Sequence, residues 1–246
     1  MKSLKHRVSR QFILCVNRGE MADQHLVYGV FKSEEKNRFI CRVVVASEEI
    51  ECYVPSSCRL DKLVALKDRE VALRPNKAKE SRTRYAIYAV KQGKELILLD
   101  QTEPNRIVEE HINNRRFSFL GKRTIIQRER TVDNYKSDLY LPETNTIIEI
   151  KSILSFERRA EFPNVLPQRG LKQLNQILAL LEKGIRVCYL LVSLNPGVKE
   201  IHIGDQYSEF HALFQRCISA GMLCKGISIK IIDETPIIYS TIPVLF

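Results

Sequence analysis

Short runs of alternating apolar and polar residues occupy the chain from Val27 to Leu99. These runs are rich in β-branched and aromatic residues, and turn-forming or charged clusters separate them: VYGVF, RFICRVVVA, EIECYVP, EVALRP, RYAIYAV and ELILLD. Strands this closely spaced predict a small barrel or sandwich. In a basic protein the OB-fold is the first candidate, because its strand face and loops bind single strands. A barrel that only braces the second half of the chain fits the pattern equally well.

The pattern changes at Pro104. PNRIVEEHINN predicts a short helix with Pro at its start, whereas RTIIQ, SDLYLP and NTIIEIKS predict strands. The turn-forming segment PETN predicts a hairpin between the last two strands. Further along the chain, apolar spacing predicts two helices, Gly170–Gly184 and Tyr207–Gly221, and two strands, Ile185–Leu194 and Ile227–Ile232. We therefore expect an OB-like β-barrel over residues 1–101 and a mixed-sheet α/β domain over residues 102–246.

The composition is that of a globular protein with a basic surface. Of the 246 residues, 44% are hydrophobic and 28% are charged, and 39 Lys and Arg against 29 Asp and Glu give a net charge of +10. This surplus favours a polyanionic partner, nucleic acid first and an anionic membrane surface second. The apolar runs are too short to span a bilayer, and the first residues show no clean apolar block followed by a small-residue cleavage site, so we expect no secretory signal. We therefore expect a cytoplasmic protein that binds DNA or RNA and does not bind a membrane.

Cysteine and histidine patterns exclude several kinds of chemistry. The seven cysteines show no zinc-ligand spacing and stand mostly in apolar runs, so reduced core thiols are expected. The five histidines are scattered, and the chain has no Gly-rich phosphate loop and no G-x-S-x-G motif. Nucleotide-driven chemistry and serine-hydrolase chemistry are therefore not expected.

The segment SDLYLPETNTIIEIKS carries the strongest chemical signal. Glu149 and Lys151 are two residues apart on one predicted strand, so their side chains project from the same face. Asp138, on the other arm of the hairpin, can approach that face. Two carboxylates that converge can bind Mg²⁺ or Mn²⁺, and a nearby ammonium group can assist an attacking water or stabilise charge on a phosphate.

An ordinary surface ion pair between Glu149 and Lys151 would give the same short motif. The metal site is favoured by its context, because these charges end the apolar run TIIEI, where an unpaired charge is costly. The basic residues around this segment fit either a path for a phosphate backbone or a solvated face; they are Lys122, Arg123, Arg128, Arg130 and Lys136.

Seven short motifs, in order, resemble the sugar fermentation stimulation (SfsA) family. They are NRF at Asn37, PN at Pro104, RE at Arg128, SDLYL at Ser137, EIKSILS at Glu149, EFPN at Glu161 and QRGLKQL at Gln168. The resemblance spans roughly Val27 to Lys230. It implies an N-terminal OB-like domain followed by a domain similar to the PD-(D/E)XK, or restriction-endonuclease-like, nucleases.

The resemblance implies roles for individual residues. Asp138, Glu149 and Lys151 fall on the metal-binding and catalytic positions of the family, and Glu129 matches a glutamate that can be a further metal ligand. The basic positions of the family, which imply contacts with nucleic acid, are Arg59, Arg128, Arg169 and Lys172. For the last two residues a solvated helix start is an equally good interpretation.

The chain departs from the family pattern at several polar positions. An Asp of the family is Asn164 here, its His is Gln173 and its Glu is Gln176. In the N-terminal half, CYVPSSCRL lacks the His and the Gly of the family segment. These departures bear on whether activity is retained, although the set Asp138, Glu149 and Lys151 is intact.

Two functions therefore remain open. The first is a Mg²⁺- or Mn²⁺-dependent nuclease that hydrolyses DNA or RNA. The alternative is a non-catalytic, regulatory DNA-binding protein, which the missing polar residues favour. Nothing in the sequence specifically supports a purely structural role, and the oligomeric state, a homodimer included, stays open.

Overall fold

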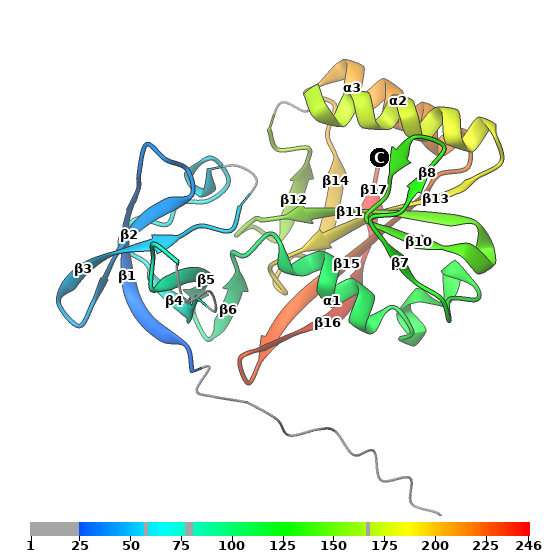
Figure 1. Ribbon diagram of the computed structural model, residues 1–246. Coiled ribbons are helices and arrows are strands. Elements are labelled where there is room, and N and C mark those ends of the chain that lie inside the picture. The colour runs from blue at the N-terminus through cyan, green and yellow to red at the C-terminus, as the bar shows by residue number, and fades with distance from the viewer. Residues whose placement is uncertain (1–24, 57–58, 77–80, 166–167) are drawn as a thin grey trace, which may run out of the picture.

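Five strands close into a barrel at the N-terminal end of the described chain (Figure 1). The computed structural model describes residues 25–56, 59–76, 81–165 and 168–246. The strands are β1 (Val27–Glu34), β2 (Ile40–Val45), β3 (Glu48–Tyr53), β4 (Glu70–Pro75) and β5 (Tyr85–Gln92). β1 pairs with β2 and β4, and a parallel pairing of β3 with β5 closes the ring. The expected OB-like barrel is confirmed.

Every second side chain along the strands points inward and fills this barrel. Cys41 and Val43 of β2 are fully buried, and so is Cys52, which lies opposite Cys41 on β3. Gly29 lets β1 approach β2, because a Cβ atom there would lie 2.7 Å from Cγ1 of Val43. The inner face is therefore apolar, and the outer face of β2 and β3 is left to solvent.

A mixed six-stranded sheet forms the second part of the molecule. Its strands, in spatial order, are β16 (Thr235–Ile242), β15 (Leu223–Ile232), β13 (Arg186–Ser193), β11 (Thr146–Ile153), β10 (Leu139–Leu141) and β7 (Gln127–Arg128). The three central strands β11, β13 and β15 are parallel, whereas the pairings toward both edges are antiparallel. Central strands are buried on both faces, which explains why TIIEI and VCYLLV read as continuous apolar runs.

Helices cover both faces of this sheet (Figure 1). α2 (Gln168–Glu182) and α3 (Ser208–Ser219) lie on one face, and α1 (Glu103–His111) lies on the other. Ile147 of β11 belongs to the core under α2 and α3, whereas Ile148 belongs to the core that includes Ile107 of α1. Because side chains alternate along β11, Glu149 and Lys151 share the α2 face with Ile147.

Smaller elements complete the fold. Three short parallel strands form a separate sheet, β12 (Arg159–Phe162), β14 (Glu200–Ile203) and β17 (Val244–Leu245). A hairpin, β8 (Thr131–Val132) and β9 (Tyr135–Lys136), precedes β10. The remaining elements are β6 (Glu95–Leu98) and the 3₁₀ turns η1 (Leu60–Lys62), η2 (Arg115–Leu120) and η3 (Pro142–Thr144).

The barrel and the second sheet contact each other through β6 and β15. The backbone N–H of Leu98 donates to the carbonyl of Leu194 at 3.2 Å, and Lys230 pairs with Glu95 at 2.9 Å. Apolar residues of both parts belong to one buried cluster. The barrel is thus packed against the sheet that carries the candidate site.

Most of the predicted elements are confirmed, with shifts of a few residues at their ends. RTIIQ is the exception, because only Gln127 of this segment is in a strand. Arg123 instead donates to main-chain carbonyls, including that of Ile112 at 2.6 Å, and Thr124 bonds to Glu143. The small sheet of β12, β14 and β17 was not expected.

The five cysteines in the described residues are free thiols, as predicted. Four are buried, and the fifth, Cys224, is half-buried. Cys15 and Cys58 lie outside the described residues. No helix in the described part of the chain is long and apolar enough to cross a membrane.

Candidate active site

Glu149 and Lys151 form the centre of the candidate site, on β11. Nζ of Lys151 lies 2.7 Å from Oε1 of Glu149. Only 3% of Glu149 is exposed, whereas 27% of the Lys151 side chain is exposed. The buried carboxylate therefore needs donors from neighbouring elements, and the lysine is open to a ligand.

Asp138 joins this pair from the neighbouring hairpin arm. It directly precedes β10, whose first residue, Leu139, lies opposite Ile148. Oδ2 of Asp138 accepts a hydrogen bond from the backbone N–H of Ile150 at 2.7 Å, which holds the carboxylate next to Glu149. The structure thus brings together the three residues predicted as the catalytic set.

Gln173 links the carboxylate and the ammonium group from α2. Its Nε2 donates to Oε1 of Glu149 at 2.6 Å, and its Oε1 accepts from Nζ of Lys151 at 2.6 Å. An amide side chain can donate and accept at once, so it satisfies both charged groups. The position at which the family pattern has His is therefore filled by a residue in direct contact with the site.

Tyr135 of β9 holds the second oxygen of Glu149. Its hydroxyl donates to Oε2 of Glu149 at 2.5 Å. Burial, and then the negative charge of Glu149, raises the pKa of Tyr135, so this hydroxyl stays a donor at neutral pH. With Lys151 and Gln173 on Oε1, three donors offset the cost of burying the carboxylate.

Asp138 has fewer compensating contacts. Nδ2 of Asn105, from α1, donates to its Oδ1 at 3.0 Å. Burial, and then the charge of Glu149, raises the pKa of Asp138 to about 6, although the bonds from Ile150 and Asn105 and the charge of Lys151 oppose this shift. Ionisation of Asp138 is therefore disfavoured by burial first and by the negative charge of Glu149 second, and a bound cation would offset both effects.

The donors at this point fit a hard divalent cation. Asp138 and Glu149 provide carboxylate oxygens, and Mg²⁺ commonly binds to one or two carboxylates while it keeps several waters. Within the described ranges no group of three or more His, Cys, Asp and Glu side chains could hold a metal ion. A metal here would therefore rest on two carboxylates, without a protein cage.

Glu129, the third predicted ligand, points elsewhere. Its backbone N–H donates to the carbonyl of Asp138 at 3.1 Å, but its carboxylate pairs with Lys136 at 2.7 Å and is exposed. Its neighbour Arg128 pairs with Glu109 at 3.1 Å. Glu129 thus lies beside the site through its main chain, and its side chain is outside the cluster.

The predicted nucleic-acid contacts are spread over the molecule. Arg59 lies in the barrel domain, where it pairs with Asp61 at 3.2 Å and donates to the carbonyl of Glu35. Arg169 and Lys172 are exposed on the first turns of α2, the helix that carries Gln173. These two residues precede Gln173 on α2 by four positions and by one position, whereas Arg59 lies in the other part of the molecule. Asn164 and Gln176, the other two residues in this part that depart from the family pattern, are both exposed.

Three contact residues were not identified as site residues from the sequence. Asn105 and Gln173 stand inside motifs that matched the family, PN and QRGLKQL, so a role for them had a signal. Tyr135 had none, because it precedes Glu149 by 14 residues on a two-residue strand. Only the folded hairpin brings its hydroxyl to the carboxylate.

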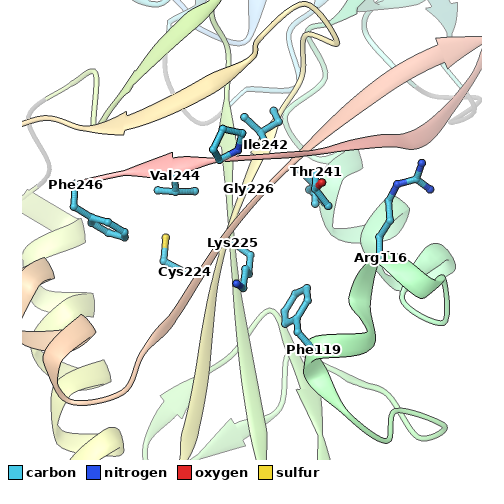
Figure 2. A pocket seen from close by; sticks show the side chains of 11 residues that line it. Arg116, Phe119, Cys224, Lys225, Gly226, Thr241, Ile242, Val244 and Phe246 are labelled. Atoms are coloured by element: carbon cyan, nitrogen blue, oxygen red, sulfur yellow. The ribbon is translucent and has the colours of Figure 1, made fainter.

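A pocket of about 540 Å³ opens elsewhere, at the edge of the sheet where β16 continues into β17. Figure 2 shows Arg116 and Phe119 on one side of it and Val244 and Phe246 on the other. Gly226 allows β15 to lie this close to the end of β16, because a Cβ atom there would be 2.6 Å from the carbonyl oxygen of Ile242. The lining residues include none of the site residues described above.

Comparison with known proteins gives two family matches. The family described as "Sugar fermentation stimulation protein RE domain" matches residues 102–235, just over half of the chain, and "SfsA N-terminal OB domain" matches residues 34–99. A sugar fermentation stimulation protein homolog of Clostridium kluyveri is 28% identical over 174 residues, which cover 69% of this chain and 75% of that protein. A homolog from a Thermoanaerobacter species is 27% identical over 202 residues, 80% of this chain and 87% of the relative.

The solved structure of a Pyrococcus furiosus protein has the same fold. It is described as "The structure of Pyrococcus Furiosus SfsA in complex with Ca2+", and it superposes with a TM-score of 0.79 at 18% identity over 92% of this chain and 98% of that one. The matches to the two family domains, in order along the sequence, lead to one conclusion: this chain belongs to the sugar fermentation stimulation protein family.

Proposed function

We propose that the chain is a nuclease that hydrolyses phosphodiester bonds of DNA or RNA with Mg²⁺ or Mn²⁺ at Asp138 and Glu149. One observation carries the proposal: two carboxylates and an ammonium group converge on one face of β11, in a fold that pairs this site with an OB barrel. The site would have the geometry of the PD-(D/E)XK nucleases. A cation bound there would polarise the phosphate and lower the pKa of a bound water.

Lys151 would act on the phosphate. Its ammonium group is held by Glu149 and Gln173 at 2.7 and 2.6 Å, while part of the side chain faces solvent. A fixed positive charge stabilises the charge that develops on phosphate oxygens in the transition state, and it does not have to reorganise during the reaction. Lys151 can also orient the attacking water.

Basic residues near the site would contact the phosphate backbone. Arg169 and Lys172 are exposed at the start of α2, and Arg128 and Lys136 lie on β7 and β9 next to Asp138. Phosphate contacts of this kind position a nucleic acid and do not depend on its sequence. The positive net charge of +10 supports the same partner.

The Ca²⁺ in the description of the Pyrococcus structure supports a divalent cation in this fold. Ca²⁺ and Mg²⁺ both take oxygen ligands, so the donors of Asp138 and Glu149 suit either ion. The raised pKa of Asp138 has the direction expected of a carboxyl group that gains from a nearby cation.

A cleavage assay tests the proposal. The purified protein is incubated with labelled single-stranded and duplex DNA and RNA, in Mg²⁺, Mn²⁺ or EDTA. Cleavage should need the metal and should be lost in Asp138→Ala and Lys151→Ala. Lys91→Ala, which removes an exposed lysine paired with Glu70 in the barrel, is the matched control and should cleave like the parent. Equal cleavage by all three variants would refute the assignment.

A second candidate is a regulatory DNA-binding protein without cleavage activity. It is favoured by the saturation of Glu149, whose two oxygens already accept from three side chains, and by the position of the Glu129 carboxylate outside the cluster. In this case binding would weaken steeply with salt and would be the same in EDTA. Metal-independent binding with no cleavage of any substrate would favour it over the nuclease.

A further inference from the structure

The outer face of β2 and β3 carries an exposed aromatic pair. Phe39, next to the start of β2, is 37% exposed, and Tyr53, at the end of β3, is 38% exposed. Their rings are inclined by only 20°, and their centroids are 6.4 Å apart. Ile40, which lies opposite Tyr53, shares this face, because its neighbour Cys41 points into the barrel, but only 7% of Ile40 is exposed. The barrel therefore presents two partly exposed aromatic rings to solvent.

Three arginines surround the aromatic pair. The guanidinium carbon of Arg38 lies 4.6 Å from the centroid of Phe39. Arg42 follows Ile40 by two residues and so projects from the same face. Arg82 reaches this face through Glu51, which it bonds at 3.0 Å and which precedes Tyr53 by two residues.

Carboxylates fix two of these arginines. Arg42 donates to Glu35 at 2.5 Å and to Glu49 at 2.9 Å, through Nε and Nη1. Arg82 donates to Glu51 through Nη2, and 73% of its side chain is exposed. A guanidinium group has five N–H donors, so these bonds engage only part of its capacity. The face thus offers two aromatic rings with guanidinium groups at its rim.

We propose that this face binds unpaired bases of single-stranded nucleic acid by stacking on Phe39 and Tyr53, with phosphates near the three arginines. We call it the stacking face; it consists of Phe39 and Tyr53, with Arg38, Arg42 and Arg82. The inference rests on the proposed function in taking nucleic acid as the partner, and it adds the substrate class.

Three arguments select this ligand. Every base has a π face, and base–aromatic stacking with arginine at the rim is how proteins bind single strands without reading their sequence. In a duplex the base faces are covered by their neighbours in the stack, so the two rings have nothing to bind. In OB barrels, strands 2 and 3 and the loops beside them form the ligand surface, and here β2 and β3 carry the aromatic pair.

Binding is measured by fluorescence anisotropy in EDTA, so that cleavage plays no part. The probes are a labelled oligothymidine of about 15 nucleotides, the same strand with abasic sites throughout, and a duplex of equal length. Phe39→Ala and Tyr53→Ala should each weaken oligothymidine binding by roughly tenfold. They should leave binding of the abasic strand nearly unchanged, because it carries phosphates and no bases.

Matched variants separate stacking from a general loss of structure. Tyr28→Ala removes an exposed aromatic residue of β1 that belongs to another part of the barrel surface, and it should bind like the parent. Phe39→Tyr keeps an aromatic face and should restore binding. Thermal unfolding of every variant confirms that the barrel is folded. Unchanged oligothymidine affinity in both alanine variants, or equal loss with the abasic strand, would overturn the inference.

Cleavage of a small substrate distinguishes this proposal from the nuclease proposal. Bis(p-nitrophenyl) phosphate has a phosphodiester bond and no strand that could reach the stacking face, so its hydrolysis in Mn²⁺ reports on the active site alone. Loss of that hydrolysis in Lys151→Ala with unchanged oligothymidine binding would support both proposals. Base-dependent binding without any hydrolysis would support the stacking face alone, and hydrolysis without base-dependent binding would overturn it alone.

Discussion

Replacing Asp138 by Asn should make the metal-free protein more stable at neutral pH. The carboxyl group is half-buried beside Glu149, and its pKa is raised to about 6. In the unfolded chain an Asp has a pKa of about 3.9. Asn keeps the size of the side chain, and its Oδ1 can still accept from the N–H of Ile150. The substitution therefore removes the unfavourable charge with little change in packing.

The magnitude and its pH dependence follow from linkage. Because the folded-state pKa lies above the unfolded one, the folded protein binds more protons between about pH 4 and pH 6. The contribution of Asp138 to stability falls as the pH rises through this window, and the full penalty is present above it. A difference of about 2 pKa units corresponds to at most about 3 kcal/mol. Asn105 must turn its amide to face the new Asn side chain, so we expect a net gain of about 1–2 kcal/mol.

Urea unfolding in EDTA at pH 4.5 and pH 7.5 measures this effect. The difference in unfolding free energy between Asp138→Asn and the parent should be larger at pH 7.5 and should shrink toward pH 4.5. Asp205→Asn, a change at an exposed position, should show no such trend. With Mn²⁺ present the parent should gain stability and the variant should not. A variant that is less stable by the same amount at both pH values would refute the reasoning.

Three further outcomes test other contacts of the site and the fold. Tyr135→Phe leaves one oxygen of the buried Glu149 without its donor, and it should lower the unfolding free energy by about 1.5–3 kcal/mol. A loss below about 0.5 kcal/mol, on the order of experimental error, would contradict the hydrogen bond. Gln173→Leu should reduce metal-dependent cleavage by about tenfold or more, because leucine cannot bond to Glu149 and Lys151, whereas Gln173→His should keep most of the activity. Equal cleavage rates in the parent and both variants would exclude a positioning role for Gln173. Gly226→Ala places a methyl group 2.6 Å from the carbonyl oxygen of Ile242 and should lower the unfolding free energy in urea by about 1–3 kcal/mol. Gly204→Ala, whose new atom would meet its nearest neighbour at 3.4 Å, should cost less, and similar losses in the two variants would show that β15 and β16 are not tightly packed at Gly226.

Local patterns predicted the elements better than their connections. Alternation identified the six strands of the N-terminal part, and the apolar run TIIEI identified β11 as a buried strand. RTIIQ contains the same Thr-Ile-Ile sequence but forms almost no strand, because Arg123 and Thr124 bond to other segments instead of a sheet partner. Strand propensity therefore indicates that a segment can form a strand, but it does not indicate whether a neighbouring strand is available to pair with it.

For the candidate site, the sequence determined the pair on β11. The spacing of Glu149 and Lys151 places both side chains on one face of any strand, and the short hairpin brings Asp138 to the same place. These facts depend on separations of a few residues along one hairpin, which local geometry fixes before the rest of the chain is considered.

Only the tertiary structure decided what surrounds that pair. Asn105, Tyr135 and Gln173 come from α1, β9 and α2, and their contacts join residues 33, 14 and 24 positions apart. It also separated the Glu129 carboxylate from the site, although its main chain is bonded to Asp138. Such contacts depend on how helices pack on the two faces of the sheet and on the direction of each side chain. Hydrophobic spacing specifies which face of an element is buried, but it does not specify which polar groups meet across that face.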